Sequence, residues 1–286
     1  MADWKARLAG DDRISAAAIS IFAVAWAFLV IKLQSVLVLG LSNALHLTEV
    51  LSEAPWEVFA TVILFGAIVL PAIVWMIVAK RSMPLGRPVD GGFGFLIGLI
   101  GFAVAFGDAA LGGTVISHPT PHPVLPFVLG IIAILFQSAV EEVYFRGWIQ
   151  PLLVRHIGAW GGIAATAIIF GLLHILAGAH EIISILNICL AGGLFGLLAW
   201  RTNGLLAPVA AHFAWNWAET VLFGLSPNPG VDVWGAIWDF DISGAVLWSG
   251  GGEGMNASLA ETFVLIALCL PLALWRRRPA DAQSIA

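Results

Sequence analysis

Long runs of apolar residues, interrupted by short polar stretches, dominate the pattern of this chain. An α-helix needs about 20 predominantly apolar residues to cross the ~30 Å hydrocarbon core of a bilayer. Eight runs approach that length, at about residues 16–39, 58–79, 92–116, 127–155, 160–177, 182–200, 205–223 and 257–275. The pattern therefore predicts an all-α polytopic membrane protein, a bundle of about eight transmembrane helices forming a single membrane domain over residues 1–286.

The basic residues alternate between loops in a way that predicts the topology. Lys and Arg gather in cytoplasmic loops of membrane proteins. The loops 42–56, 117–126, 178–181 and 224–254 contain neither residue. The remaining loops and both chain ends carry them (Lys5, Arg7, Arg13, Lys80, Arg81, Arg87, Arg155, Arg201, Arg276, Arg277, Arg278). We expect both termini in the cytoplasm. We also expect an extracytoplasmic Trp- and Gly-rich loop at 224–254, with Trp234, Trp238 and Trp248 at the headgroup interface.

The composition agrees with a chain that lies mostly in lipid. Of its 286 residues, 60% are hydrophobic and only 11% are charged, and the mean hydropathy is +0.95. A soluble domain averages about 25% charged residues. There is no basic tract of the kind that binds nucleic acid, so the expected partners are membrane lipids and a membrane-associated substrate. The oligomeric state stays open.

The fourth apolar run contains an unexpected concentration of charge, Glu141-Glu142-Val143-Tyr144-Phe145-Arg146. A charge near the bilayer centre costs at least about 2.5–3.5 kcal/mol, which makes such residues functional candidates. Glu142 and Arg146 are spaced i, i+4 and share a helix face. Glu141 projects from another face without that partner. We predict that Glu142 and Arg146 form a structural pair and that Glu141 is chemically active. The alternative is that the acid–base pair only holds helices together.

Two further polar pairs lie inside apolar runs. Phe170 and His174 belong to the fifth run, and His212 and Asn216 to the seventh. The members of each pair are four residues apart and share a helix face. When the rise per residue is counted from the predicted helix ends, Glu141, His174, His212 and Asn216 lie at similar depth in the bilayer. Three helices should therefore bring a carboxylate, two imidazoles and an amide into one intramembrane active site.

This set of side chains suits hydrolysis. Glu141, oriented by His174, would be the base that activates water. His212 and the Asn216 amide would donate hydrogen bonds to the oxyanion of the intermediate. The alternative is a zinc site with Glu141, His174 and His212 as ligands and one position open for water. The sequence has no HExxH helix, and the metal-free interpretation is the one we favour, with no cofactor.

At these residues the chain resembles a known family. Glu141-Glu142 with Arg146, Phe170 with His174, and His212 with Asn216 are similar to the three ordered motifs of the CPBP, or abortive-infection, intramembrane endopeptidases, which include the type-II CAAX prenyl protease. The resemblance covers a catalytic core of about 127–223. It implies a glutamate-dependent peptidase, historically classed as a metalloprotease, in which Glu141 activates water. Glu142, Arg146 and Phe170 would support the site. It also implies a membrane-anchored or lipidated peptide substrate and a bacterial inner membrane location.

Two other kinds of function remain open at this point. One is a non-catalytic scaffold or immunity protein that uses the same bundle for binding. The other is a transporter in which Asp108, Glu219 and Glu261, three further acids within apolar runs, relay protons. The absence of a clear internal repeat in the sequence argues against the transporter.

Overall fold

Helices account for nearly all of the structure, a computed structural model that describes residues 13–112, 115–118, 124–225 and 233–275. The longer helices are α2 (Arg13–Ala44), α3 (Glu53–Ala79), α4 (Pro88–Leu111), α5 (Val124–Glu142), α6 (Gln150–Ala177), α7 (Ile182–Thr202), α8 (Leu206–Trp217) and α10 (Leu259–Leu274). Shorter pieces are η1 (Val143–Ile149), η2 (Ala218–Leu222), α9 (Val246–Ser249) and η3 (Gly251–Ala257). The predicted all-α membrane fold is confirmed. The topology markers Lys5, Arg7 and Arg276 to Arg278 lie outside the described residues.

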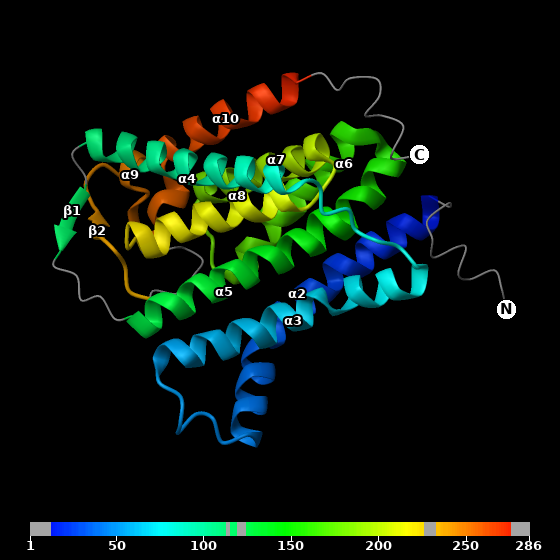
Figure 1. The fold of residues 1–286 in the computed structure, drawn as a ribbon, viewed down its shortest axis with the longest axis horizontal. Helices are drawn as coiled ribbons and strands as arrows, with labels where there is room; N and C mark the ends of the chain where they lie inside the picture. Colours follow the sequence, from blue (N-terminus) through cyan, green and yellow to red (C-terminus); the bar gives the residue numbers. More distant parts are fainter. Residues whose placement is uncertain (1–12, 113–114, 119–123, 226–232, 276–286) are drawn as a thin grey trace.

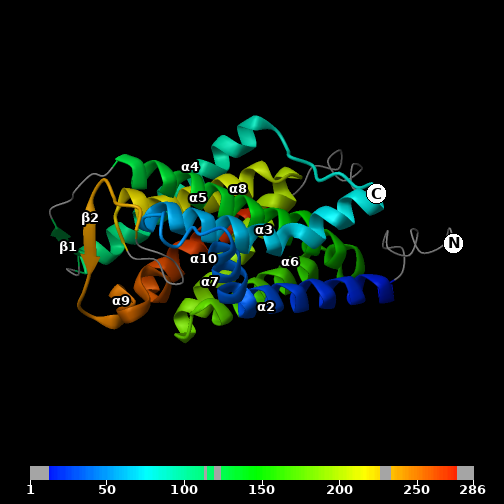
Figure 2. The same cartoon turned by 90° about the horizontal axis from the view of Figure 1, so that it is seen from below.

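The helices form two groups joined by one long central segment (Figures 1 and 2). Helices α4, α7, α8 and α10 share one hydrophobic core. Helices α2 and α3 pack on the other side, where a second core joins them to η1 and α6. The segment α5–η1–α6 runs between the groups and contributes to both sides. The residues on this segment are therefore placed at the centre of the bundle.

The count of eight membrane spans is not confirmed, because six segments of the described chain are long and apolar enough to cross a membrane. One of the six, Val124–Ala177, contains two of the predicted spans in 54 helical residues. The chain turns within it at Gly158, whose φ of 77° and ψ of 168° break the helix. A Cβ on Gly162 would touch the backbone of Val154, so the two arms lie close together there. The seventh predicted span is not among the six, because its helix is too short: α8 has 12 residues, and η2, which follows it, has only 5.

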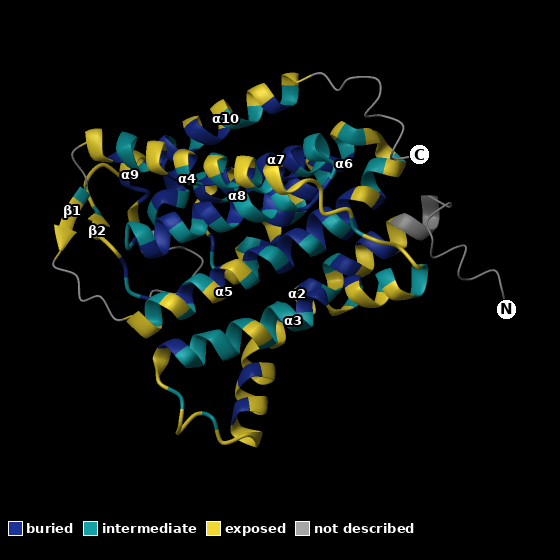
Figure 3. Ribbon diagram, in the orientation of Figure 1, coloured by how far each residue is buried: buried dark blue, intermediate teal, exposed yellow. Residues whose placement is uncertain are grey.

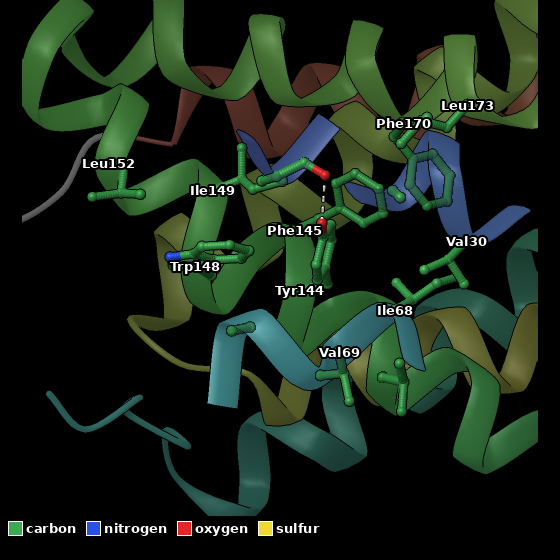
Figure 4. Packing of buried hydrophobic residues seen from close by; sticks show 14 of the residues in the cluster. Val30, Ile68, Val69, Tyr144, Phe145, Trp148, Ile149, Leu152, Phe170 and Leu173 are labelled. Atoms are coloured by element: carbon green, nitrogen blue, oxygen red, sulfur yellow. Dashed lines mark hydrogen bonds between the residues drawn. The ribbon is translucent and has the colours of Figure 1, made fainter. Parts of the chain in front are cut away.

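The fourth predicted helix differs from expectation at its most polar point. Regular α-helix ends at Glu142, and the next seven residues wind as a π-helix, η1. Four of its side chains, Tyr144, Phe145, Trp148 and Ile149, enter the core with Val30 and Ile68 of α2 and α3 (Figure 4). The Tyr144 hydroxyl donates to the Ala23 carbonyl at 2.6 Å. The wider π turn is thus held by packing and by a buried hydrogen bond, and π segments are frequent at functional sites.

Helices α4 and α8 approach each other through glycines. A Cβ on Gly94 would meet the Ala207 carbonyl, and one on Gly98 would meet the Ala211 carbonyl. Small residues allow this approach between membrane helices. The close approach at Gly94 and Gly98 fixes the face of α8 that carries His212.

The region after α4 differs most from the sequence prediction. The third span ends at Leu111 rather than near 116, and β1 (Val115–His118) pairs antiparallel with β2 (Asp239–Ile242). The interfacial role predicted for Trp234 is wrong, since this side chain is only 3% exposed. Its ring packs where a Cβ on Gly130 of α5 would lie. The hydropathy pattern could not distinguish a tryptophan at the lipid surface from one inserted between helices.

Exposed residues cover the outer faces of the bundle (Figure 3), and many of them are large and apolar. Leu96, Ile100 and Val104 of α4 are examples, as are Phe263 and Leu270 of α10. A soluble monomer rarely exposes continuous apolar surface of this extent. These faces are what a lipid-embedded protein presents to the hydrocarbon core, so the chain is an integral membrane protein.

Candidate active site

The four residues predicted to act in catalysis line one cavity. Glu141 reaches it from α5, His174 from α6, and His212 and Asn216 from α8. Its volume is about 100 Å³. The sequence placed these side chains at one depth, and the structure adds that their helices face one another. Their catalytic roles remain predictions.

Beside this cavity, one carboxylate oxygen accepts hydrogen bonds from two side chains. Glu142 Oε1 accepts a hydrogen bond from Arg146 Nη1 at 2.8 Å and one from His212 Nδ1 at 2.9 Å. The carboxylate and the guanidinium are fully buried. Arg146 Nη2 also donates to the Gly192 carbonyl of α7 at 2.8 Å. The Glu142–Arg146 pair predicted from the spacing is present, and it connects α5, α7 and α8.

Aromatic rings surround the same group of charges. The Arg146 guanidinium lies 4.9 Å from the Phe170 ring centroid and 5.4 Å from that of Phe195. The Phe195 ring stacks on His212 at 4.6 Å, and Phe170 lies 4.4 Å from His174. A guanidinium over ring faces is stabilised by cation–π attraction, more strongly where water is excluded. Phe170 and Phe195 therefore both pack against the site, and Phe195 was not among the residues predicted from the sequence.

The Glu141 side chain is held by a different residue from the one that we expected from the sequence. We expected His174 to orient it, but the described contacts show Gln137 Nε2 donating to Glu141 Oε1 at 3.2 Å. Gln137 lies one helical turn earlier on α5, where i, i+4 pairs meet. The second oxygen, Glu141 Oε2, is buried and has no hydrogen-bond partner among the described residues. That oxygen is available to a water molecule or to substrate.

The surroundings of the two histidines indicate which ring nitrogen carries a proton. His174 Nδ1 lies 2.8 Å from the Phe170 carbonyl, which can only accept, so Nδ1 is the donor. His212 Nδ1 faces the Glu142 carboxylate and donates for the same reason. In a neutral imidazole the other nitrogen is then an acceptor. Each histidine thus retains Nε2 for contacts within the cavity.

The geometry does not fit the zinc alternative. Within the described part of the chain, no three His, Cys, Asp or Glu side chains gather as ligands of one ion. A catalytic zinc site takes three protein ligands at about 2.0–2.3 Å, arranged tetrahedrally with a water. Glu141, His174 and His212 share the cavity wall without such an approach, so no step below is assigned to a metal.

A second, wider cavity reaches the same residues from the side. It has a volume of about 520 Å³ and lies between α2, α3, α5 and α6. Thr61, Gln137, Glu141 and His174 line both cavities. The other lining residues are mainly apolar, among them Ala27, Ile31, Val38, Leu64, Phe65, Ile68, Phe145 and Leu173. Glu141 therefore lies at the junction of a small polar cavity and a large apolar one.

Several lining residues were not predicted as part of the site. Gln137 could have been found from its i, i+4 spacing to Glu141, and Glu219 and Glu261 from their position within apolar runs. Thr61 and Trp234 gave no such signal, because nothing in the sequence shows that α3 and the loop before β2 meet α5. Tertiary packing alone brings them to the cavity.

The sequence around this site matches one protein family. Residues 123–218 match the family model described as type II CAAX prenyl endopeptidase Rce1-like. The resemblance drawn from the three motifs is thereby confirmed, and the matched residues include all four predicted catalytic residues. At the level of the family, the activity is that of an intramembrane CAAX-type endopeptidase. No curated protein and no solved structure matches the chain.

Proposed function

We propose that this protein hydrolyses a peptide bond in a membrane-anchored or lipidated peptide or protein, with Glu141 activating the attacking water. One observation carries the proposal: an unpartnered, buried oxygen of Glu141 lies in a cavity that His174, His212 and Asn216 also line. Such an arrangement supplies a base and hydrogen-bond donors around one small volume, as acyl transfer to water requires.

The cavity suits water as the nucleophile. A water molecule occupies about 30 Å³ in the liquid, so a volume of about 100 Å³ holds a few molecules. Buried waters also need two to four polar partners. Glu141 Oε2 and His174 Nε2 are acceptors that would hold and orient one of them.

In the proposed reaction the Glu141 carboxylate removes a proton from water as the water oxygen bonds to the peptide carbonyl carbon. The resulting oxyanion accepts hydrogen bonds from the Asn216 amide and from Nε2 of a protonated His212. His212 Nδ1 donates to the Glu142 carboxylate, which holds the ring in this position. As the C–N bond breaks, protonated Glu141 gives its proton to the leaving nitrogen, which releases an acid and an amine.

The wide cavity supports the substrate class. Its wall between α2 and α3 is mainly apolar, and it reaches Gln137, Glu141 and His174. Ligand pockets that bury a long apolar group have volumes of about 300–1,000 Å³, a range that contains the observed value of about 520 Å³. A lipid chain or an apolar peptide segment seated there would bring an adjacent peptide bond to Glu141.

The test uses purified full-length protein in lipid vesicles and a fluorescence-quenched peptide with a lipid anchor. Glu141→Gln keeps the shape of the side chain and removes the base, so turnover should fall by about 10²–10⁴-fold. Glu49→Gln, the same change in an exposed loop residue, is the matched control and should retain wild-type turnover. Equal turnover by wild type and Glu141→Gln would refute the mechanism.

The same preparation tests the rival functions and the zinc alternative. Binding of the peptide without cleavage would favour the scaffold, and peptide or proton flux across the vesicle would favour the transporter. We expect full activity from protein that contains no stoichiometric metal by elemental analysis. One zinc per chain, with activity lost on chelation and restored by zinc, would defeat the metal-free mechanism.

A further inference from the structure

Two buried glutamates line the small cavity but have no part in the reaction described above. Glu219 lies in η2 and Glu261 in the first turn of α10, and both lie beyond the Rce1-like match. Their exposed fractions are 3% and 1%. Glu219 Oε1 and Glu261 Oε2 are each buried without a hydrogen-bond partner among the described residues. The cavity therefore has two carboxyl groups, additional to Glu141, with unused acceptor capacity.

Glu261 occupies a position from which a glutamate often caps its own helix. In a capping box the carboxylate accepts from the backbone N–H of the capping serine three residues earlier. Ser258 Oγ does accept from the Glu261 N–H at 3.1 Å. The Ser258 N–H, however, donates to the Met255 carbonyl at 2.9 Å. The Glu261 carboxylate is thus left to the cavity.

The described wall of the cavity includes neither Lys nor Arg that could neutralise these acids. The nearby Arg146 is already bonded to Glu142 and to the Gly192 carbonyl. Glu219 and Glu261 line the same small cavity. Buried carboxylates without a counter-charge are unfavourable, so a cation entering the cavity would stabilise their charged forms.

We propose that Glu219 and Glu261 form a binding site for a positively charged amine of the substrate, next to the scissile bond. The inference rests on the proposed function and narrows its substrate class to peptides that bring an ammonium group to the active site. The ammonium belongs either to a basic side chain flanking the scissile bond or to the amine released when that bond breaks. Both sources present the same charge and hydrogen-bond donors to the two carboxylates.

The first arm of the test compares peptides that carry lysine or its neutral isostere norleucine at each position flanking the scissile bond. Wild-type protein should favour lysine at one position by at least about tenfold in kcat/KM, as expected for hydrogen bonds to a charged group. Glu219→Gln and Glu261→Gln should each lower this ratio toward one, and the ratio divides out any general loss of activity. Asp108→Asn removes an acid of α4 that does not line the cavity, and it should leave the ratio unchanged.

The second arm tests the released amine. A product fragment with a free N-terminus should inhibit wild-type protein at least about tenfold more strongly than its N-acetylated form. Glu219→Gln and Glu261→Gln should each reduce that difference. A preference in either arm that depends on both acids supports the site and identifies the source of the ammonium. Equal values for charged and neutral ligands in both arms overturn it.

Failure of the inference and failure of the proposed function are distinguishable. If wild-type protein cleaves both peptide series without charge preference, only the ammonium site is wrong. If it cleaves no peptide, the same ligands are added to Glu141→Gln protein and its thermal stabilisation is measured. Greater stabilisation by the ammonium ligands, lost in the Glu219→Gln background, keeps the site and removes only the proposed reaction. Equal stabilisation rejects both.

Discussion

Glu142 fixes more of the active-site geometry than any other described side chain. A single oxygen accepts from Arg146 and from His212, which belong to the central segment and to α8. The spacing in the sequence revealed only the contact with Arg146. Because His212 is 70 residues away, its contact with the same oxygen depends on how α8 packs. The residue types of the site could be predicted from the sequence, but not this network.

The first prediction separates the two adjacent glutamates. Glu142→Gln leaves the Arg146 guanidinium buried without a counter-charge, which typically costs about 3–5 kcal/mol. We expect a markedly lower unfolding temperature in detergent, together with loss of turnover. Glu141→Gln is the matched control and should unfold close to the wild-type temperature, because the one described hydrogen bond of Glu141, with Gln137, can also form with an amide. A stable, inactive Glu142→Gln beside an active Glu141→Gln would reverse the two roles.

At the scale of the helices, the residue ranges of the long helices could be predicted from hydropathy. The irregular elements between them could not. Apolar runs located α2, α3, α7 and α10 because burial in lipid is what the pattern records. The π-helix after Glu142 depends instead on the core into which Tyr144 and Trp148 pack. The pairing of β1 with β2 is a contact between segments more than a hundred residues apart, which no local pattern encodes.

The second prediction tests the approach of α4 to α8. Gly98→Ala places a methyl group against the Ala211 backbone, which cannot move without shifting α8. Overpacking of this kind costs about 1–3 kcal/mol, so we expect a lower unfolding temperature. Gly66→Ala on α3 is the matched control, since nothing lies within 4 Å of its added Cβ.

The Gly66 control should be neutral or stabilising by up to about 1 kcal/mol, because alanine is the better helix former. Since His212 lies on α8 directly after Ala211, Gly98→Ala should also reduce turnover of the quenched peptide more than Gly66→Ala does. Equal unfolding temperatures for the two variants would contradict the close contact.

At the scale of the whole molecule, the arrangement of basic residues still predicts an orientation that awaits measurement. The described segments establish an integral membrane protein. The loop pattern places the β1–β2 sheet outside. This orientation would put Trp234 and the start of α10 in the outer half of the bundle.

The third prediction concerns that orientation. Reporter fusions at the C-terminus and at Asp239 in β2 should give opposite signals, with the C-terminus cytoplasmic. Paired fusions to a reporter active only inside and to one active only outside make each result self-checking. The same signal at both positions would exclude an extracytoplasmic 224–254 loop joined to cytoplasmic termini.

The shared wall of the two cavities has a consequence for how the proposed reaction depends on the membrane. Thr61, Gln137, Glu141 and His174 face both the apolar cavity and the polar one. A substrate dissolved in the bilayer would arrive by lateral diffusion through the apolar side, while the water that it consumes occupies the polar side. The two reactants then do not compete for one passage. Turnover would follow the mole fraction of substrate in the bilayer rather than its bulk concentration, so diluting the substrate with inert lipid would slow the reaction even at constant bulk concentration.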